Sequence, residues 1–145
     1  MSTANMNVGQ VMSGNVTYIP RDTCIRDAAL KMKELDCGFL PIANSAQDKL
    51  MGVVTDRDVV IRSVAEGRNP FETTVDEIKS DSVLYCFRDD PIEKAAQSMQ
   101  DQQVYRLVVL DGEESKQLCG VISLNDIVRH RERDMAATAA EGIAG

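Results

Sequence analysis

Two short motifs combine a hydroxyl side chain with a carboxylate three residues later. One is Gly52-Val-Val-Thr55-Asp-Arg-Asp58 and the other is Gly120-Val-Ile-Ser123-Leu-Asn-Asp126. In each motif an apolar run ends at the hydroxyl residue, so we expect a strand to end and a helix to begin there. The free N–H groups of a helix N-terminus suit phosphate, and an aspartate beside them can accept hydrogen bonds from a ribose diol. The same residues also fit a capping box, in which they only close the helix end.

Both motifs belong to an internal repeat that fills most of the chain. Residues 8–40 match 75–107 at an offset of 67, and after one added residue 50–60 match 118–128 at an offset of 68. A unit of about 60 residues is marginally stable alone, so we expect the two copies to fold together. The expected boundaries are 1–7 for a flexible N-terminus, 8–67 for the first repeat, 68–74 for a crossover linker, 75–134 for the second repeat and 135–145 for a helix end and tail.

Each repeat has the same expected order of elements: strand, helix, strand, strand, helix. Short apolar runs predict the strands, and apolar residues at helical spacing predict the helices. We expect strands at 16–19, 39–42, 50–54, 83–87, 107–110 and 118–122, and helices that begin after Asp22-Thr23, at Pro91, near Asp56 and near Leu124. Gly67 suits the C-terminal end of the helix that begins near Asp56. The last helix is expected to fray from Met135. The fold class is α/β (α+β), with tandem β-α-β-β-α repeats packed as a pseudo-twofold pair.

Composition narrows the class of partner. The chain has 145 residues and a net charge of −7, which disfavours a broad surface for nucleic acid or an anionic membrane. The net charge does not exclude a local basic pocket that binds a small anion. No run of residues fits a membrane span or a signal peptide, so we expect a cytoplasmic protein. A GxGxxG turn and a Walker lysine motif are also absent from the sequence.

The cysteines and the single histidine offer little material for catalysis. The four cysteines have no CxxC spacing, and we interpret them as small buried hydrophobes, with a redox role as the alternative. His130 is the one histidine, which argues against a histidine-based metal site or a nucleophile–base pair. We therefore expect no metal site, no catalytic residue and no enzyme activity.

The repeat resembles a CBS-domain pair, also called a Bateman module. The runs that carry the resemblance are Gly52-Val-Val-Thr-Asp-Arg-Asp-Val-Val60, Gly38-Phe-Leu-Pro-Ile42 and Val104-Tyr-Arg-Leu-Val-Val-Leu110. The resemblance covers roughly residues 8–131 and extends to stand-alone bacterial proteins that contain little more than one pair. It implies two packed sheets with two related clefts between the repeats, which in this family commonly bind adenosine-containing ligands. AMP, ADP, ATP, NAD and S-adenosylmethionine are the ligands that it implies.

Carried over by position, the resemblance implies two unequal ligand sites. One combines residues of the first motif with residues of the second repeat, namely Thr55, Arg57, Asp58, Val83, Val104, Tyr105 and Arg106. The other combines residues of the second motif with residues of the first repeat, namely Ser123, Asp126, Val16, Cys37, Gly38 and Phe39. Gly38 leaves room for a base, whereas Tyr105 at the matching position could stack on a base or fill the space. Phe39 replaces Arg106, so the Asp126 site is expected to lack that cation, and we favour the site with Asp58 and Arg106.

These features lead to a regulatory module as the first hypothesis. It would sense an adenosine-containing nucleotide and signal through altered packing or through an unidentified protein partner in trans, and the resemblance implies a homodimer. The alternative is a ligand-free scaffold or dimerisation protein whose clefts are filled by side chains such as Tyr105 and Phe39. A thiol-redox-responsive variant is a third hypothesis. A basic run at 129–133 is interpreted as a solvated helix face that could also reach across a dimer interface.

Overall fold

The computed structural model of this chain describes residues 6–14, 16–46, 48–80 and 84–144. These residues form two compact units. Unit 1 contains the described residues up to Val16, then Leu84–Ser115 and the chain from Cys119 on, and unit 2 contains the described residues from Thr17 to Ser80 with Lys116–Leu118. The expected flexible N-terminus lies outside the described residues as far as residue 5, and Val83 lies outside them too. Asn7, within the expected flexible segment, instead caps the first helix.

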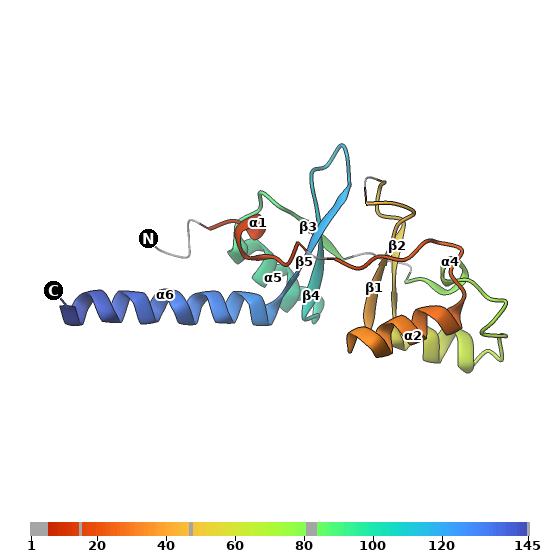
Figure 1. The fold of residues 1–145 in the computed structure, drawn as a ribbon. Coiled ribbons are helices and arrows are strands. Elements are labelled where there is room, and N and C mark those ends of the chain that lie inside the picture. Colours follow the sequence, from red (N-terminus) through yellow and green to blue (C-terminus); the bar gives the residue numbers. More distant parts are fainter. Residues whose placement is uncertain (1–5, 15, 47, 81–83, 145) are drawn as a thin grey trace. The chain divides into compact units, whose positions relative to one another are not determined.

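Unit 2 packs helices against a two-stranded sheet (Figure 1). Its elements are α2 (Ile25–Leu35), β1 (Phe39–Ile42), β2 (Gly52–Thr55), α3 (Asp56–Asp58), the π-helix η2 (Val59–Val64) and α4 (Val75–Ile78). Strands β1 and β2 are antiparallel, with Phe39 opposite Thr55. The motif with Thr55 and Asp58 therefore stands where β2 ends and a helix begins, as predicted.

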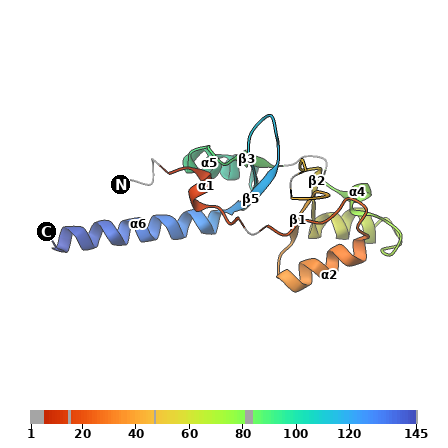
Figure 2. The ribbon, with the colours of Figure 1, turned by 45° about the horizontal axis from the view of Figure 1, so that its top comes forward.

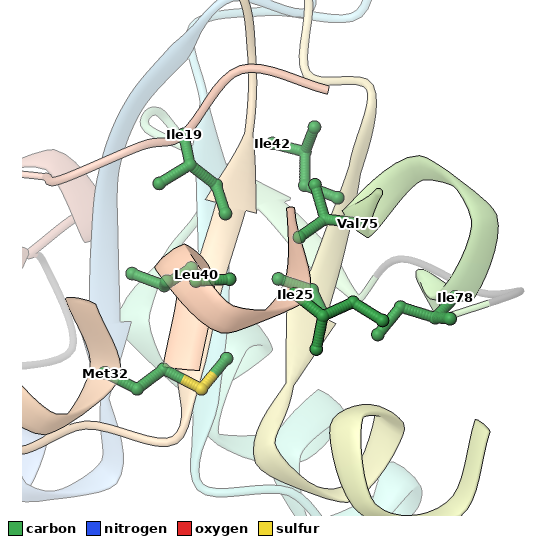
Figure 3. Packing of buried hydrophobic residues seen from close by; sticks show 9 residues of the cluster. Ile19, Ile25, Met32, Leu40, Ile42, Val75 and Ile78 are labelled. Carbon is green, nitrogen blue, oxygen red and sulfur yellow. The ribbon is translucent and has the colours of Figure 1, made fainter. Parts of the chain in front are cut away.

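Apolar side chains from these elements meet in one core (Figure 3). Helix α2 contributes Ile25 and Met32 from its buried face, β1 contributes Leu40, and α4 contributes Val75 and Ile78. Burying one such side chain contributes about 1.5–3 kcal/mol. The apolar spacing that predicts α2 in the sequence is thus the face that holds it to the sheet.

Unit 1 contains a three-stranded sheet in the order β3-β4-β5. Its elements are α1 (Val8–Val11), β3 (Tyr85–Phe87), α5 (Ile92–Gln102), β4 (Arg106–Leu110), β5 (Leu118–Ser123) and α6 (Leu124–Ala144). Strands β3 and β4 are parallel, and the core includes Val8, Met99, Leu107 and Ile122. Both units combine helices with short strands, and the predicted α+β fold class is confirmed. None of the described helices is long and apolar enough to cross a membrane.

Each repeat begins with a short helix that packs on the other repeat. We call residues 8–13 and 75–80 the leading segments. In unit 1, α1 lies beside α5 and α6 (Figure 2), and Ser13 exchanges backbone hydrogen bonds with Val121 of β5. In unit 2, α4 contacts β2 and η2, and the Ser80 N–H donates to the Val53 carbonyl at 2.9 Å. The compact units therefore contain the leading segment of one repeat and the body of the other.

These two short helices are absent from the sequence-based prediction. Each nevertheless carries a capping box: Asn7 with Gln10 in α1, and Thr74 with Glu77 in α4. That pattern is a recognised helix start. Four residues are too few for a helix to be stable by itself, because nucleation is costly. Packing on the other repeat is what stabilises them.

The first predicted strand, at 16–19, is wrong except for one bridge. Ile19 forms a parallel bridge with Ile42, in the same relation as Cys86 to Val109 in the second repeat. In that second repeat the Val108 N–H also donates to the Leu84 carbonyl at 3.1 Å. Pro41 occupies the matching position of the first repeat and has no N–H, so the ladder cannot extend there.

Several helix ends differ from the prediction. Pro91 is the N-cap of α5 instead of its first residue. Helix α2 begins at Ile25 with Cys24 as its N-cap, directly after Asp22-Thr23 as predicted. Helix α6 continues to Ala144, beyond the expected fraying at Met135, and it extends past α1 and α5 (Figures 1 and 2).

The third helical segment changes to a π-helix and ends before Gly67. In η2 the Ala65 N–H donates to the Val60 carbonyl at 2.9 Å, and the C-cap is Ala65. Its apolar residues Val60, Ile61 and Val64 are exposed, whereas Ser63 is buried. The segment therefore turns a polar residue inward and an apolar stripe outward.

A glycine in each motif allows a leading segment to cross the strand closely. A Cβ at Gly120 would lie 2.5 Å from the Met12 Sδ and 2.8 Å from the Ser13 carbonyl oxygen. At Gly52 a Cβ would lie 2.9 Å from the Lys79 Cδ. Close approach of the backbone explains the glycine at 120, and close approach of the Lys79 side chain explains the one at 52.

We predict that Gly120→Ala destabilises the protein by about 1–3 kcal/mol, because the added methyl group overpacks a backbone contact. Urea unfolding monitored by circular dichroism would measure the change. Gly112→Ala is the matched control in the same unit, since nothing lies within 4 Å of a Cβ there. Equal stability of the two variants would contradict the packing role of Gly120.

Candidate functional site

The Asp58 turn is a capping box with additional donors. The Thr55 Oγ1 accepts a hydrogen bond from the Asp58 N–H at 3.1 Å, and the Thr55 N–H donates to Asp58 Oδ2 at 2.9 Å. The Ser80 hydroxyl donates to the same Oδ2 at 2.7 Å, and the Arg62 Nε lies 3.8 Å from Oδ1. Asp58 is only 7% exposed, so these partners compensate a nearly buried carboxylate. The capping interpretation is confirmed for this motif.

The Asp126 turn has the same local geometry with fewer partners. The Ser123 N–H donates to Asp126 Oδ2 at 2.9 Å, and the Asp126 N–H donates to the Ser123 Oγ at 3.0 Å. Asp126 is more exposed than Asp58. Within the described part of the chain, no side chain donates to its carboxylate.

Sequence reasoning missed Ser80 and Arg62 as parts of the Asp58 turn. Ser80 matches Ser13 in the repeat, and that coincidence is the signal that could have found it. The leading segment that carries Ser80 is anchored by Lys79, whose Nζ lies 2.9 Å from Asp76 Oδ1 and donates to the Met51 carbonyl at 3.3 Å. The hydrogen bond from Lys79 lowers the pKa of the Asp76 carboxyl. This anchor places the Ser80 hydroxyl on Asp58.

Each turn lies against the start of the middle strand of its own repeat. The Asp56 N–H donates to the Gly38 carbonyl at 2.9 Å, and the Leu124 N–H donates to the Tyr105 carbonyl at 2.9 Å. In unit 2 this brings Cys37, Gly38 and Phe39 close to the Asp58 turn, and in unit 1 it brings Val104, Tyr105 and Arg106 close to the Asp126 turn. Each of the two ligand sets expected from the sequence combines residues of both units. Both sets therefore stay predictions.

The individual candidate residues differ in their exposure to solvent. Tyr105 is 76% exposed, and Arg106 is exposed without an ion-pair partner among the described residues. Arg57 is also exposed, and its N–H donates to Asp56 Oδ1 at 2.8 Å. Four other candidates are half-buried: Val16, Cys37, Phe39 and Val104.

The space at Gly38 is not open as the sequence suggested. The Asp56 Oδ2 lies 2.5 Å from the position that a Cβ would take, so a carboxylate already covers this glycine. A base could contact Gly38 only if the Asp56 side chain moved. The expectation of free room at Gly38 is therefore corrected.

The turns, their glycines and the repeat agree with one family. The model of the CBS domain matches residues 8–64 and, a second time, residues 75–133. The chain belongs to the CBS-domain family. It contains two copies of the domain and is a CBS pair.

The CBS pair is similar to other proteins over most of its length. Hypoxic response protein 1 of Mycobacterium tuberculosis is 34% identical over 120 residues, which are 83% of this chain and 81% of that protein. The CBS domain-containing protein YhcV of Bacillus subtilis is 30% identical over 139 residues, which are 95% of each chain.

Solved structures have the same fold. The crystal structure of Hypoxic Response Protein I with two coordinated zinc ions has a TM-score of 0.76 and 34% identity, and the match covers 86% of this chain and 98% of that one. The CBS domain pair of protein MJ0100, in complex with 5′-methylthioadenosine and S-adenosyl-L-methionine, has a TM-score of 0.72 at 22% identity, with coverage of 89% and 98%. In the described part of this CBS pair, no group of three or more His, Cys, Asp or Glu side chains could hold a metal ion.

The cysteines of unit 1 have thiols of low reactivity. Cys86 is buried in β3, and burial raises the pKa of its thiol to about 12. Burial also raises the pKa of the Cys119 thiol. Because their pKa values are raised, both thiols are protonated at neutral pH. The thiolate is the reactive form of cysteine, so both groups react slowly. Their environment disfavours the redox hypothesis for these two residues.

We predict that iodoacetamide modifies Cys86 very slowly in the folded CBS pair. A pKa of about 12 in place of 9.0 lowers the thiolate fraction about a thousandfold at a given neutral pH. Mass spectrometry of peptides after timed alkylation, with a urea-denatured sample as the control, would measure the rate. Labelling of Cys86 at equal rates in both samples would revive the redox hypothesis.

Proposed function

We propose that this CBS pair is a regulatory module that binds an adenosine-containing nucleotide through its strand–helix turns. The observation that carries the proposal is the pair of capped turns, each of which combines N–H groups of a helix start with an aspartate. The MJ0100 pair, which has the same fold, is complexed with two adenosine compounds, and this supports the ligand class. Ligand binding would alter packing or the binding of a protein partner in trans. We propose no catalytic role.

The Asp58 turn, with Arg106 from the second repeat, is the site that we favour. An exposed arginine without an ion-pair partner among the described residues suits a phosphate group, and a charged hydrogen bond of that kind contributes about 1.5–3 kcal/mol. Ligands with phosphate, such as AMP, ADP, ATP and NAD, are then expected to bind more tightly than S-adenosylmethionine. The buried Asp58 carboxylate would accept bonds from the ribose through Oδ1 after the Arg62 side chain shifts.

We predict that one of these ligands raises the unfolding temperature by several degrees. A ligand at 100 times its dissociation constant adds about 2.7 kcal/mol to the stability of the folded state. Differential scanning fluorimetry of the full chain against AMP, ADP, ATP, NAD and S-adenosylmethionine would detect the shift. Asp58→Asn and Arg106→Gln are expected to abolish it.

Asp27→Asn is the matched control, because it removes a surface carboxylate of unit 2 whose one ion-pair partner among the described residues is its neighbour Arg26. Loss of the shift in Asp126→Asn instead of Asp58→Asn would move the site to the second turn. The absence of a shift with every ligand would favour the scaffold hypothesis.

We further propose that the pair forms a homodimer through the exposed stripe of Val60, Ile61 and Val64. These residues are 54%, 51% and 70% exposed, respectively, although all three are apolar. Val128, the repeat counterpart of Val60, is also exposed on α6. Two copies of one chain would thus offer matching apolar surfaces to each other, as a twofold interface requires.

We predict that Val64→Glu shifts the protein from dimer to monomer, because a buried unpaired carboxylate is costly in an interface. Sedimentation equilibrium would measure the mass of each variant. Ala29→Glu adds the same charge at an exposed position of α2 and is expected to leave the dimer intact. A monomeric native protein would overturn this proposal.

A further inference from the structure

A polar pocket opens between α1 and α6 within unit 1. Its volume is about 190 Å³, and its lining comes from Gln10 and Val11 of α1 and from Asp126, Arg129, His130 and Arg133 of α6. The α6 residues follow each other at spacings of three, one and three, so they share one face of the helix. The sequence alone favoured a solvated face for the basic run. Arg129 and Arg133 are exposed, which agrees with that interpretation, and with the half-buried His130 they line this open pocket. Arg131 is exposed too and is not among the lining residues.

The charges in the lining are predominantly positive. Neither Arg129 nor Arg133 has an ion-pair partner among the described residues. By contrast, Arg21, Arg62 and Arg88 lie within 3.9 Å of carboxylate oxygens. The Arg133 Nε donates to the Arg129 carbonyl at 3.4 Å, so this guanidinium has a backbone partner but no carboxylate partner among the described residues. The two arginines lie together in a chain whose net charge is −7. Neighbouring guanidinium groups repel each other, and an oxyanion would relieve that repulsion.

Two further residues define the chemistry of the pocket. The Gln10 carboxamide oxygen accepts a hydrogen bond from the Asn7 N–H at 2.9 Å, so its amino group is the end that can donate to a ligand. Asp126 is the single acidic residue of the lining, and its Oδ2 already accepts the Ser123 N–H. The lining therefore offers two guanidinium groups and one amide as donors, and a single carboxylate, which already accepts one hydrogen bond.

The size of the pocket limits the ligand. Pockets for whole drug-sized ligands measure about 300–1,000 Å³, so about 190 Å³ is too small to enclose a nucleotide. It suits one or two phosphate groups. We propose that this pocket binds the phosphate oxygens of a small oxyanion such as pyrophosphate, or of the phosphate end of a larger ligand. This site does not depend on the Asp58–Arg106 proposal.

Isothermal titration of the full chain with pyrophosphate at low ionic strength tests the inference. Arg129→Gln and Arg133→Gln are each expected to raise the dissociation constant at least tenfold. Arg131→Gln removes the same charge from the same helix outside the pocket, and we expect less than a twofold change. Circular dichroism of each variant would verify that α6 is intact. Absence of binding, or an equal loss in Arg131→Gln, would overturn the site.

A second arm identifies the source of the phosphate. If Arg133→Gln weakens ATP and pyrophosphate alike and the two compete, the pocket holds the phosphate end of a nucleotide. If only pyrophosphate binding weakens, the pocket takes the free oxyanion. Both results support the site. Asp58→Asn reports on the nucleotide proposal independently, since it leaves every residue of this pocket unchanged.

Discussion

The close crossing of each leading segment over the second paired strand is the constraint on which both turns depend. Backbone bonds join Ser80 to Val53 in unit 2 and Ser13 to Val121 in unit 1. At Gly120 a Cβ would collide with the Ser13 carbonyl oxygen, so the absence of a side chain allows that backbone crossing. At Gly52 a Cβ would meet the Lys79 side chain, which crosses there. The strand residues that they hold lead directly into the two capping boxes. A glycine, a crossing segment and a capped aspartate therefore work as one local assembly in each unit.

The two assemblies share their backbone geometry and differ in their side chains. In unit 2 the leading segment supplies a hydroxyl to Asp58, and Arg62 approaches the other oxygen. These contacts stabilise a nearly buried carboxylate, and removing them from Asp58 would cost free energy. In unit 1 the carboxylate of Asp126 is more exposed and borders a basic pocket. Duplication of one unit has thus produced two turns of different electrostatic character.

The position of positive charge is a property of the folded chain more than of its composition. The overall acidic balance suggests repulsion of anions, and the loss of arginine at Phe39 suggests a second site without a cation. Helix α6 nevertheless places Arg129 and Arg133 on the face that carries Asp126, and α1 closes the pocket from the other repeat. Local charge at the pocket, not net charge, determines what binds at short range.

The sequence by itself determined the repeat, the α+β class, the family, the core face of α2 and the capped turns at Thr55 and Ser123. These features depend on side chains within a few residues of each other, where periodicity and hydrogen-bonding patterns are legible. Tertiary structure decided the placement of α1 and α4, the covering of Gly38 by Asp56, the bond from Ser80 to Asp58 and the pocket beside Arg129. Even the loss of the first predicted strand depended on Pro41, far along the chain from residue 17. Such contacts join residues that are distant in sequence, and their geometry exists only after the chain has folded.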